Sequence, residues 1–163
     1  MNMADPRQKT NELRLACFSL EGQNYAVDIM KIRQIIRPAK IRPLPQAPDF
    51  IEGVINLRGA VIPVMDLRKR FKMKTDTTRE PRIIIVSVER HVMGVVVDDV
   101  SEVISVSQEQ VQPAPQLSGI PGRFLAGACQ WKDDILLLLN LDELLTSEEK
   151  ESLAEIKGRI RKE

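Results

Sequence analysis

Two adjacent carboxylates, Asp98 and Asp99, follow the apolar run Gly94–Val97 and are the first residues whose types and spacing suggest chemistry. Paired carboxylates at the end of a strand can hold Mg²⁺, and such a site can support phosphoryl transfer when a further Asp and a Lys close neighbouring strands. No Asp and Lys follow Asp99 in that arrangement. The pair is therefore predicted to form a strand-end turn, and a phospho-accepting regulator remains an alternative function.

Other catalytic groups are scarce in this sequence. His91 is the single histidine and lies in a charged reversal between two apolar runs, which is typical of a solvated turn. Cys17 and Cys129 stand alone in apolar surroundings without a C-x-x-C partner and are predicted to be core thiols. The glycine-rich, zinc-binding and nucleophile motifs of common enzymes are absent. The sequence predicts no enzyme activity, no cofactor and no metal.

Charge and hydropathy exclude further classes of partner. Lys and Arg number 24 against 23 Asp and Glu, a net charge of +1. A basic run follows position 67, but aromatic residues make up only 4% of the chain, so a stacking platform for nucleic acid is missing. The longest apolar run, Ile135–Leu139, is far too short to cross a bilayer, and the N-terminus has no signal-peptide core. We expect a cytoplasmic protein without direct membrane insertion.

One exposed-looking turn, Arg58-Gly59, interrupts two apolar runs in "NLRGAVIPVMDL" (residues 56–67). Gly59 suits a backbone that needs positive φ. Arg58 is framed by apolar residues, and an arginine in such surroundings is a typical interface anchor, able to make bidentate bonds to a partner's carboxylate. The alternative is that Arg58 is merely exposed.

The elements that would position these residues are mostly short strands. Asp28 could cap a helix over Ile29–Ile36, whose isoleucines fall at helical spacing, and Pro38 would end it. A capping box of Thr146 and Glu149 begins a C-terminal helix. Residues 101–104 remain ambiguous between helix and strand. Strands are predicted over Leu13–Leu20, Tyr25–Val27, Gly53–Asn56, Val61–Met65, Ile83–Val88, Val92–Val97, Phe124–Gln130 and Ile135–Leu141.

This organisation occurs twice in the chain. "FIEGVINLRGAVIPVMDL" (50–67) aligns without gaps on "FLAGACQWKDDILLLLNL" (124–141), and "AVDIMKIRQII" (26–36) aligns on "GVVVDDVSEVI" (94–104). A proline-rich stretch follows the upstream segment in both copies. A repeated unit of short strands with Gly or Pro at the turns predicts two small, similar β-barrels that pack together through an apolar seam.

The segments "FSLEGQNYAVDIMKIRQII", "PLPQAPDFIEGVINLRGAVIPVMDLRKRF", "GVVVDDVSEVISV" and "FLAGA" resemble the CheW family of chemotaxis coupling proteins, from about Leu15 to Leu145. The resemblance implies a mainly β fold of two intertwined SH3-like five-stranded barrels with short helices. The chain is expected to divide into a polar tail (1–11), one domain of two barrels (12–145) and, after the capping box, a C-terminal helix (146–163). The resemblance also implies a non-catalytic adaptor between the regulatory domain of the histidine kinase CheA and the cytoplasmic tip of methyl-accepting chemotaxis receptors.

Site residues follow from the same resemblance. The implied receptor-contacting residues are Ile32, Gln34, Gly53, Asn56, Arg58 and Gly59, and the implied kinase-facing residues are Ile83, Ile84 and Val103, any of which could instead be core. Gln34 stands where family members commonly carry an acid, so one charge is lost there. A coupling protein of a non-flagellar pathway, serving twitching or developmental signalling, is an alternative within the same family.

Overall fold

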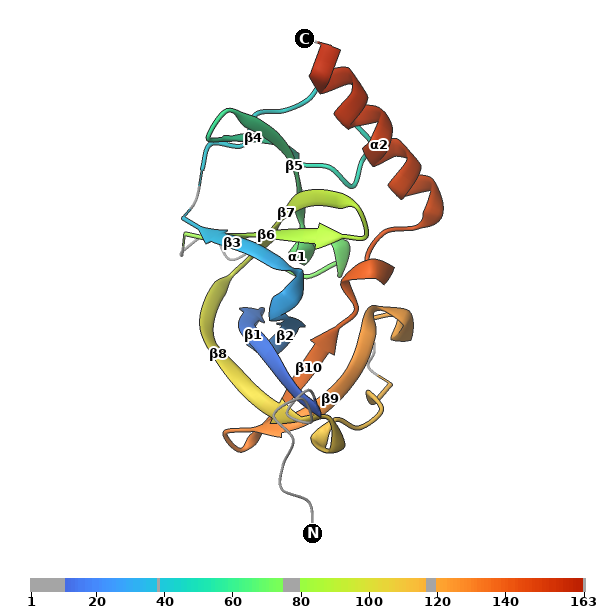
Figure 1. The fold of residues 1–163 in the computed structure, drawn as a ribbon. Coiled ribbons are helices and arrows are strands. Elements are labelled where there is room, and N and C mark those ends of the chain that lie inside the picture. Colours follow the sequence, from blue (N-terminus) through green and yellow to red (C-terminus); the bar gives the residue numbers. More distant parts are fainter. Residues whose placement is uncertain (1–10, 38, 75–79, 117–119, 163) are drawn as a thin grey trace.

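The computed structural model describes residues 11–37, 39–74, 80–116 and 120–162, with side chains to residue 156. Within these ranges the chain forms two five-stranded sheets (Figure 1). Barrel 1 has the strand order β3 (Ile32–Ile36), β6 (Arg82–Val88), β7 (His91–Val97), β5 (Ala60–Asp66), β4 (Gly53–Leu57). Barrel 2 has the order β8 (Asp99–Ser107), β1 (Glu12–Leu20), β2 (Gln23–Asp28), β10 (Asp134–Leu139), β9 (Leu125–Trp131). The predicted mainly β fold of two SH3-like barrels is confirmed.

The two halves of the chain exchange strands. The sequence repeat makes β1–β5 equivalent to β6–β10, yet barrel 1 combines β3, β4 and β5 with β6 and β7, while barrel 2 combines β8, β9 and β10 with β1 and β2. Each exchange is closed by one parallel pair, β5 with β7 and β10 with β2. The registers correspond, because Val64 pairs with Gly94 and Leu138 pairs with Ala26 at aligned positions of the repeat.

The predicted helix over Ile29–Ile36 is wrong. Asp28 does cap a turn, since its Oδ1 accepts a hydrogen bond from the Met30 amide at 2.9 Å, but the turn is only a 3₁₀ segment, η2 (Ile29–Lys31). The chain then extends as β3 and pairs antiparallel with β6. Alternate residues of β3 are more exposed, which is the period of a strand, and β-branched isoleucine favours that state. The ambiguous residues 101–104 belong to β8.

The main hydrophobic core runs through the seam between the barrels. Its aromatic rings form a chain in which neighbouring centroids lie 5.9, 6.2 and 5.4 Å apart, through Phe18, Tyr25, Phe71 and Phe124. Phe18 and Tyr25 come from barrel 2, whereas Phe71 follows the short helix α1 (Leu67–Arg70) that leaves barrel 1. The remaining short turns are η3 (Gln108–Gln110), η4 (Gly122–Phe124) and η5 (Leu141–Glu143).

Both cysteines are buried in barrel 2, as predicted for core thiols. Burial, with a smaller contribution from Glu102, raises the pKa of Cys17 to about 11. Burial also raises the pKa of Cys129. Neither thiol is therefore an activated nucleophile, because reactivity requires the thiolate.

The C-terminal helix α2 (Ser147–Lys162) follows the last strand of barrel 2 and lies beside barrel 1 (Figure 1). Its capping box forms as predicted: Thr146 Oγ1 accepts from the Glu149 amide at 3.1 Å, and Glu149 Oε1 accepts from the Thr146 amide at 2.9 Å. Leu153 and Ile156 are buried in the main core. Ile160, which continues the apolar spacing of Leu153 and Ile156, lies beyond the described side chains. No helix in the described ranges has the length and apolar content of a membrane span.

Glu149→Gln is expected to make the free energy of unfolding depend less steeply on pH in the acidic range. Burial by itself would raise the pKa of Glu149, but hydrogen bonds from Arg70 and Thr146 outweigh burial and hold the pKa below its ordinary value of 4.5. A folded-state pKa below the unfolded value means that the ionised carboxylate stabilises the fold above the unfolded pKa, and that this stability is lost as the pH falls through the folded pKa. Gln preserves the capping box.

Urea unfolding from about pH 7 to about pH 3 measures this contribution as the pH dependence of the unfolding free energy. The free energy should fall more steeply for the wild type than for Glu149→Gln, whereas Glu148→Gln, at the exposed neighbouring position, should behave as the wild type. Parallel profiles for the wild type and Glu149→Gln would contradict the assignment.

Candidate docking site

The β4–β5 hairpin presents Arg58 at its tip. Arg58 and Gly59 have φ values of 53° and 87°, so both central residues of the turn are left-handed, as a type I′ turn requires. The Leu57–Ala60 pair closes the turn, and Asn56 Oδ1 accepts a hydrogen bond from the Gly59 amide at 2.9 Å. Arg58 is exposed, and in the described part of the chain no ion pair engages it. The turn therefore projects a free guanidinium from a rigid hairpin.

Gly53 has a structural role in the same hairpin. A Cβ at this position would lie 2.3 Å from the carbonyl oxygen of Arg42, which is far inside contact distance. The close approach lets Arg42 and Val54 exchange two backbone hydrogen bonds of 2.8 Å, which hold the proline-rich segment against β4. The second repeat uses the same device, because Gly127 leaves room for the bridge between Gln112 and Ala128.

The six residues predicted to contact the receptor all belong to barrel 1, but they come from its two outermost strands. Gly53, Asn56, Arg58 and Gly59 lie together on the β4–β5 hairpin. Ile32 and Gln34 lie on β3 at the other end of the strand order, and both are half-buried. Ile32 packs against the main core. The structure thus unites four of these residues on one hairpin and places two on a separate strand.

The predicted kinase-facing residues divide between core and surface. Ile83 and Ile84 are each 1% exposed and lie inside barrel 1, so their side chains are core and the surface role implied for them is wrong. They belong to a nearly continuous apolar strand, which is typical of burial on both faces. Val103 is 46% exposed on β8, an outer strand of barrel 2. Val103 therefore remains available to a partner.

Exposed apolar residues occur at equivalent positions of the two barrels, which sequence reasoning missed. The repeat aligns Ile35 (38% exposed) with Val103, and Val61 (37% exposed) with Ile135 (48% exposed). The aligned sequence could have revealed Ile35, Val103 and Ile135, because each directly follows a charged or polar residue on its strand, whereas Val61 has no such neighbour within two positions. Matched apolar positions on two similar barrels indicate two similar surfaces.

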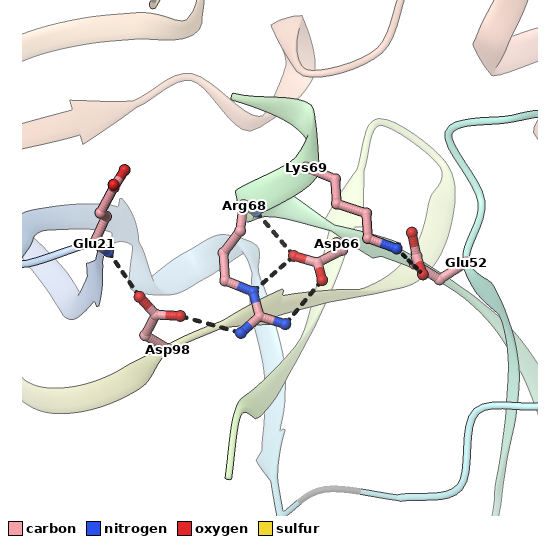
Figure 2. Close-up of polar contacts among 6 residues, drawn as sticks. All are labelled: Glu21, Glu52, Asp66, Arg68, Lys69 and Asp98. Atoms are coloured by element: carbon pink, nitrogen blue, oxygen red, sulfur yellow. Dashed lines mark hydrogen bonds and ion pairs between the residues drawn. The ribbon is translucent and has the colours of Figure 1, made fainter. Parts of the chain in front are cut away.

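A buried ionic network joins the barrels (Figure 2). Asp66 caps α1 by accepting from the Arg68 amide at 2.9 Å, and its carboxylate also accepts from Arg68 Nε and Nη2 at 3.0 and 2.9 Å. Arg68 Nη1 donates to Asp98 at 3.2 Å, and Asp98 accepts from the amide of Glu21 in the β1–β2 turn at 2.7 Å. The hydrogen bond to Asp66 is the main cause that raises the pKa of Arg68.

This network explains two of the sequence motifs. Asp98 is occupied by Arg68 and Glu21, so the acidic pair is a strand-end turn, as predicted, and not an open cation site. The start of the basic run is also structural: Arg68 is buried, and Arg70 pairs with Glu149. Lys69 pairs with Glu52 at 2.9 Å (Figure 2). Within the described ranges, no group of three or more His, Cys, Asp or Glu side chains could hold a metal ion.

Comparison with known proteins agrees with this architecture. The model of the CheW-like domain family matches residues 14–149. The chain is 33% identical over 151 residues to "Chemotaxis protein CheW" of Treponema pallidum, covering 89% of each protein, and 36% identical over 134 residues to the protein of that name from Klebsiella aerogenes, covering 81% of each. The crystal structure of the scaffolding protein TtCheW from Thermoanaerobacter tengcongensis matches with a TM-score of 0.76 and 33% identity, covering 84% of this chain and 96% of that one.

Proposed function

This chain belongs to the CheW family of chemotaxis proteins, and we propose that it is a non-catalytic adaptor that joins chemosensory receptors to a CheA-type histidine kinase. The observation that carries the proposal is the rigid hairpin that projects Arg58, a free cation, next to apolar residues. Arginine beside apolar surface is typical of residues that dominate binding energy at interfaces.

The receptor side of the adaptor is the β4–β5 hairpin together with Ile32 and Gln34 of β3. A receptor tip built as a helical hairpin would pack on the half-buried Ile32 and offer a carboxylate to Arg58. Gln34 supplies hydrogen-bonding groups without charge, so this contact does not select for a basic residue on the receptor.

The kinase side is the pair of matched apolar surfaces. A regulatory domain that is itself a double barrel has two similar surfaces to offer, which suits a chain that exposes Val103 on one barrel and the equivalent Ile35 on the other. Such contacts would recruit the protein to membrane-associated receptor arrays from the cytoplasm.

Two other functions can be compared with this proposal: a phospho-accepting regulator and a coupling protein of a non-flagellar pathway. A phospho-accepting function finds no support, because the Asp98 carboxylate is already occupied by an arginine and a backbone amide. A coupling role in twitching or developmental signalling uses the same surfaces, so it is distinguished by which receptor and kinase bind.

Arg58→Glu is expected to abolish receptor coupling while the protein stays folded, because a charge reversal at an exposed hairpin tip disturbs docking and not packing. The measurement is a pull-down with receptor-tip fragments and CheA-type kinases encoded in the same genome, combined with kinase autophosphorylation. The matched control is Lys132→Glu at the equivalent turn of barrel 2, which should retain receptor binding.

The possible results are distinct. The adaptor proposal requires the wild type to bind both partners and to make the kinase responsive to the receptor. Unchanged receptor binding by a folded Arg58→Glu variant would overturn the role of the hairpin. Binding of the wild type to neither partner would overturn the adaptor proposal itself.

A further inference from the structure

We propose that Arg42 is a second cationic anchor on the same docking face as Arg58, and that this face fits a helix with two carboxylates about two turns apart and a small apolar residue between them. The inference rests on the proposed receptor-coupling function, since it names the chemistry of the partner at that site. Arg42 lies outside the residues that the family resemblance implies.

The backbone places Arg42 on the outer face of the hairpin whose tip carries Arg58. Arg42 and Val54 exchange both of their backbone hydrogen bonds, so their side chains lie on the same side of the sheet. Alternation along β4 puts Asn56 on that side as well, while Gly53 and Ile55 face inward. The pairing of Asn56 with Val61 adds an apolar side chain from β5.

This outer face is apolar in the middle and cationic at its two ends. Val54 is half-buried and Val61 exposed, whereas the exposed Arg42 and Arg58 flank them. In the described ranges no ion pair engages Arg42. Its unsatisfied charge is thus available to a partner, unlike those of Lys69 and Arg70, which are paired within the chain.

Local charge supports an acidic partner. Residues 29–48 contain no acid and five basic residues, Lys31, Arg33, Arg37, Lys40 and Arg42. The equivalent residues 97–118 contain no Lys or Arg and four acids, Asp98, Asp99, Glu102 and Glu109. Of these two equivalent segments, only the one in the half that carries Arg58 is basic, and its charge would attract a negatively charged surface.

The acidic segment of a second copy is a poorer match for this face than a separate acidic helix. Asp98 is buried against Arg68, and Glu102 pairs with Lys132 at 3.2 Å, so two of the four acids are already engaged within the chain.

The spacing of the anchors specifies the helix. Arg42 lies beside Val54, and Arg58 follows Val54 by four positions, which corresponds to at most about 13 Å. Carboxylates seven or eight residues apart on a helix are separated by about 10–12 Å along its axis, and the flexible arginine side chains can take up the difference. A small apolar residue midway would face Val54 and Val61.

Charge reversal at Arg42 tests the inference on the full-length protein. The probe is the set of cytoplasmic hairpin fragments of receptors from the same genome, with affinity measured by titration calorimetry at low and high salt. Arg42→Glu should weaken binding of the coupled receptor fragment at least tenfold and reduce its salt dependence, and Arg42→Gln should have a smaller effect of the same sign. Kinase binding should be unchanged.

The matched control is Gln112→Glu, which adds a negative charge at the equivalent bridge of barrel 2 and should leave receptor binding intact. A receptor fragment in which one acid of the predicted pair is replaced by lysine should regain affinity for Arg42→Glu. Thermal unfolding verifies that each variant is folded.

The outcomes distinguish the role of Arg42 from the adaptor function. If Arg58→Glu abolishes receptor binding while a folded Arg42→Glu variant binds as the wild type does, the role of Arg42 is overturned and the adaptor function stands. If the wild type binds no receptor fragment, the adaptor function itself fails. If sedimentation shows salt-sensitive self-association that Arg42→Glu removes while receptor binding is unaffected, the occupant is a second copy and the acidic-helix proposal is overturned.

Discussion

Arg68→Ala is expected to lower the free energy of unfolding by about 3–5 kcal/mol, the typical effect of removing one partner from a buried ion pair. The substitution leaves Asp66 and Asp98 without their cation, although both side chains are at most 10% exposed. It also removes the contact that joins α1 at the end of barrel 1 to the β1–β2 turn of barrel 2. Urea unfolding followed by circular dichroism measures the loss.

The neighbouring Lys69→Ala is the matched control, since it removes a basic residue from the same helix. Its partner is Glu52, but the lysine side chain is 59% exposed, and exposed pairs contribute about 0–1 kcal/mol. A loss for Arg68→Ala no larger than that for Lys69→Ala would show that the network does not stabilise the fold.

Gly53→Ala is expected to cost about 3–5 kcal/mol and to weaken receptor binding, although no side chain is removed. The new Cβ would fall 2.3 Å from the Arg42 carbonyl oxygen, and backbone cannot yield as a flexible side chain can. Overpacking of this kind typically costs about 1–3 kcal/mol, and displacing Arg42 breaks two hydrogen bonds worth about 1 kcal/mol each. In the Gly53→Ala variant the amides of Arg42 and Val54 should exchange hydrogen faster than in the wild type, because their hydrogen bonds are broken.

Gly22→Ala provides the comparison for this second prediction. Gly22 also has a positive φ, 79°, but nothing lies within 4 Å of the place that a methyl group would take, so the substitution strains the turn without displacing a neighbour. It should cost less than Gly53→Ala and leave receptor binding unchanged. Preserved exchange protection at Arg42 in the Gly53→Ala variant would refute the role assigned to Gly53.

The repeat made the two barrels predictable, but not the exchange between them. Alignment shows which segments are equivalent, such as residues 50–67 and 124–141, and short strands with turn residues between them favour barrels. The parallel pairs, β5 with β7 and β10 with β2, cannot be predicted from the hydrophobic patterns of these four strands. The hydrophobic pattern of a strand indicates which of its faces is buried, but it does not indicate which strand lies next to it in the sheet.

The site is predictable where local chemistry determines it. The Arg58-Gly59 turn is predictable because a glycine between two apolar strands favours the positive φ of a tight hairpin turn, and the structure has this hairpin. The sequence alone places Arg68 in an ordinary basic run, because its burial depends on Asp98, 30 positions away in the chain. The isoleucines at 29, 32, 35 and 36 fit helical spacing, and residues 32–36 become a strand because they pair with β6.

The exchange of strands has a consequence for the history of the chain. Two separate copies of one five-strand half could form the same two barrels if each copy contributed its first hairpin to the barrel of the other. Fusing two copies of the gene into one would therefore require no new pairing between strands. The same exchange builds each barrel from both halves of the chain, so neither half alone contains all the strands of one barrel. The topology of this single chain is therefore one that two identical five-strand chains could also form as a homodimer.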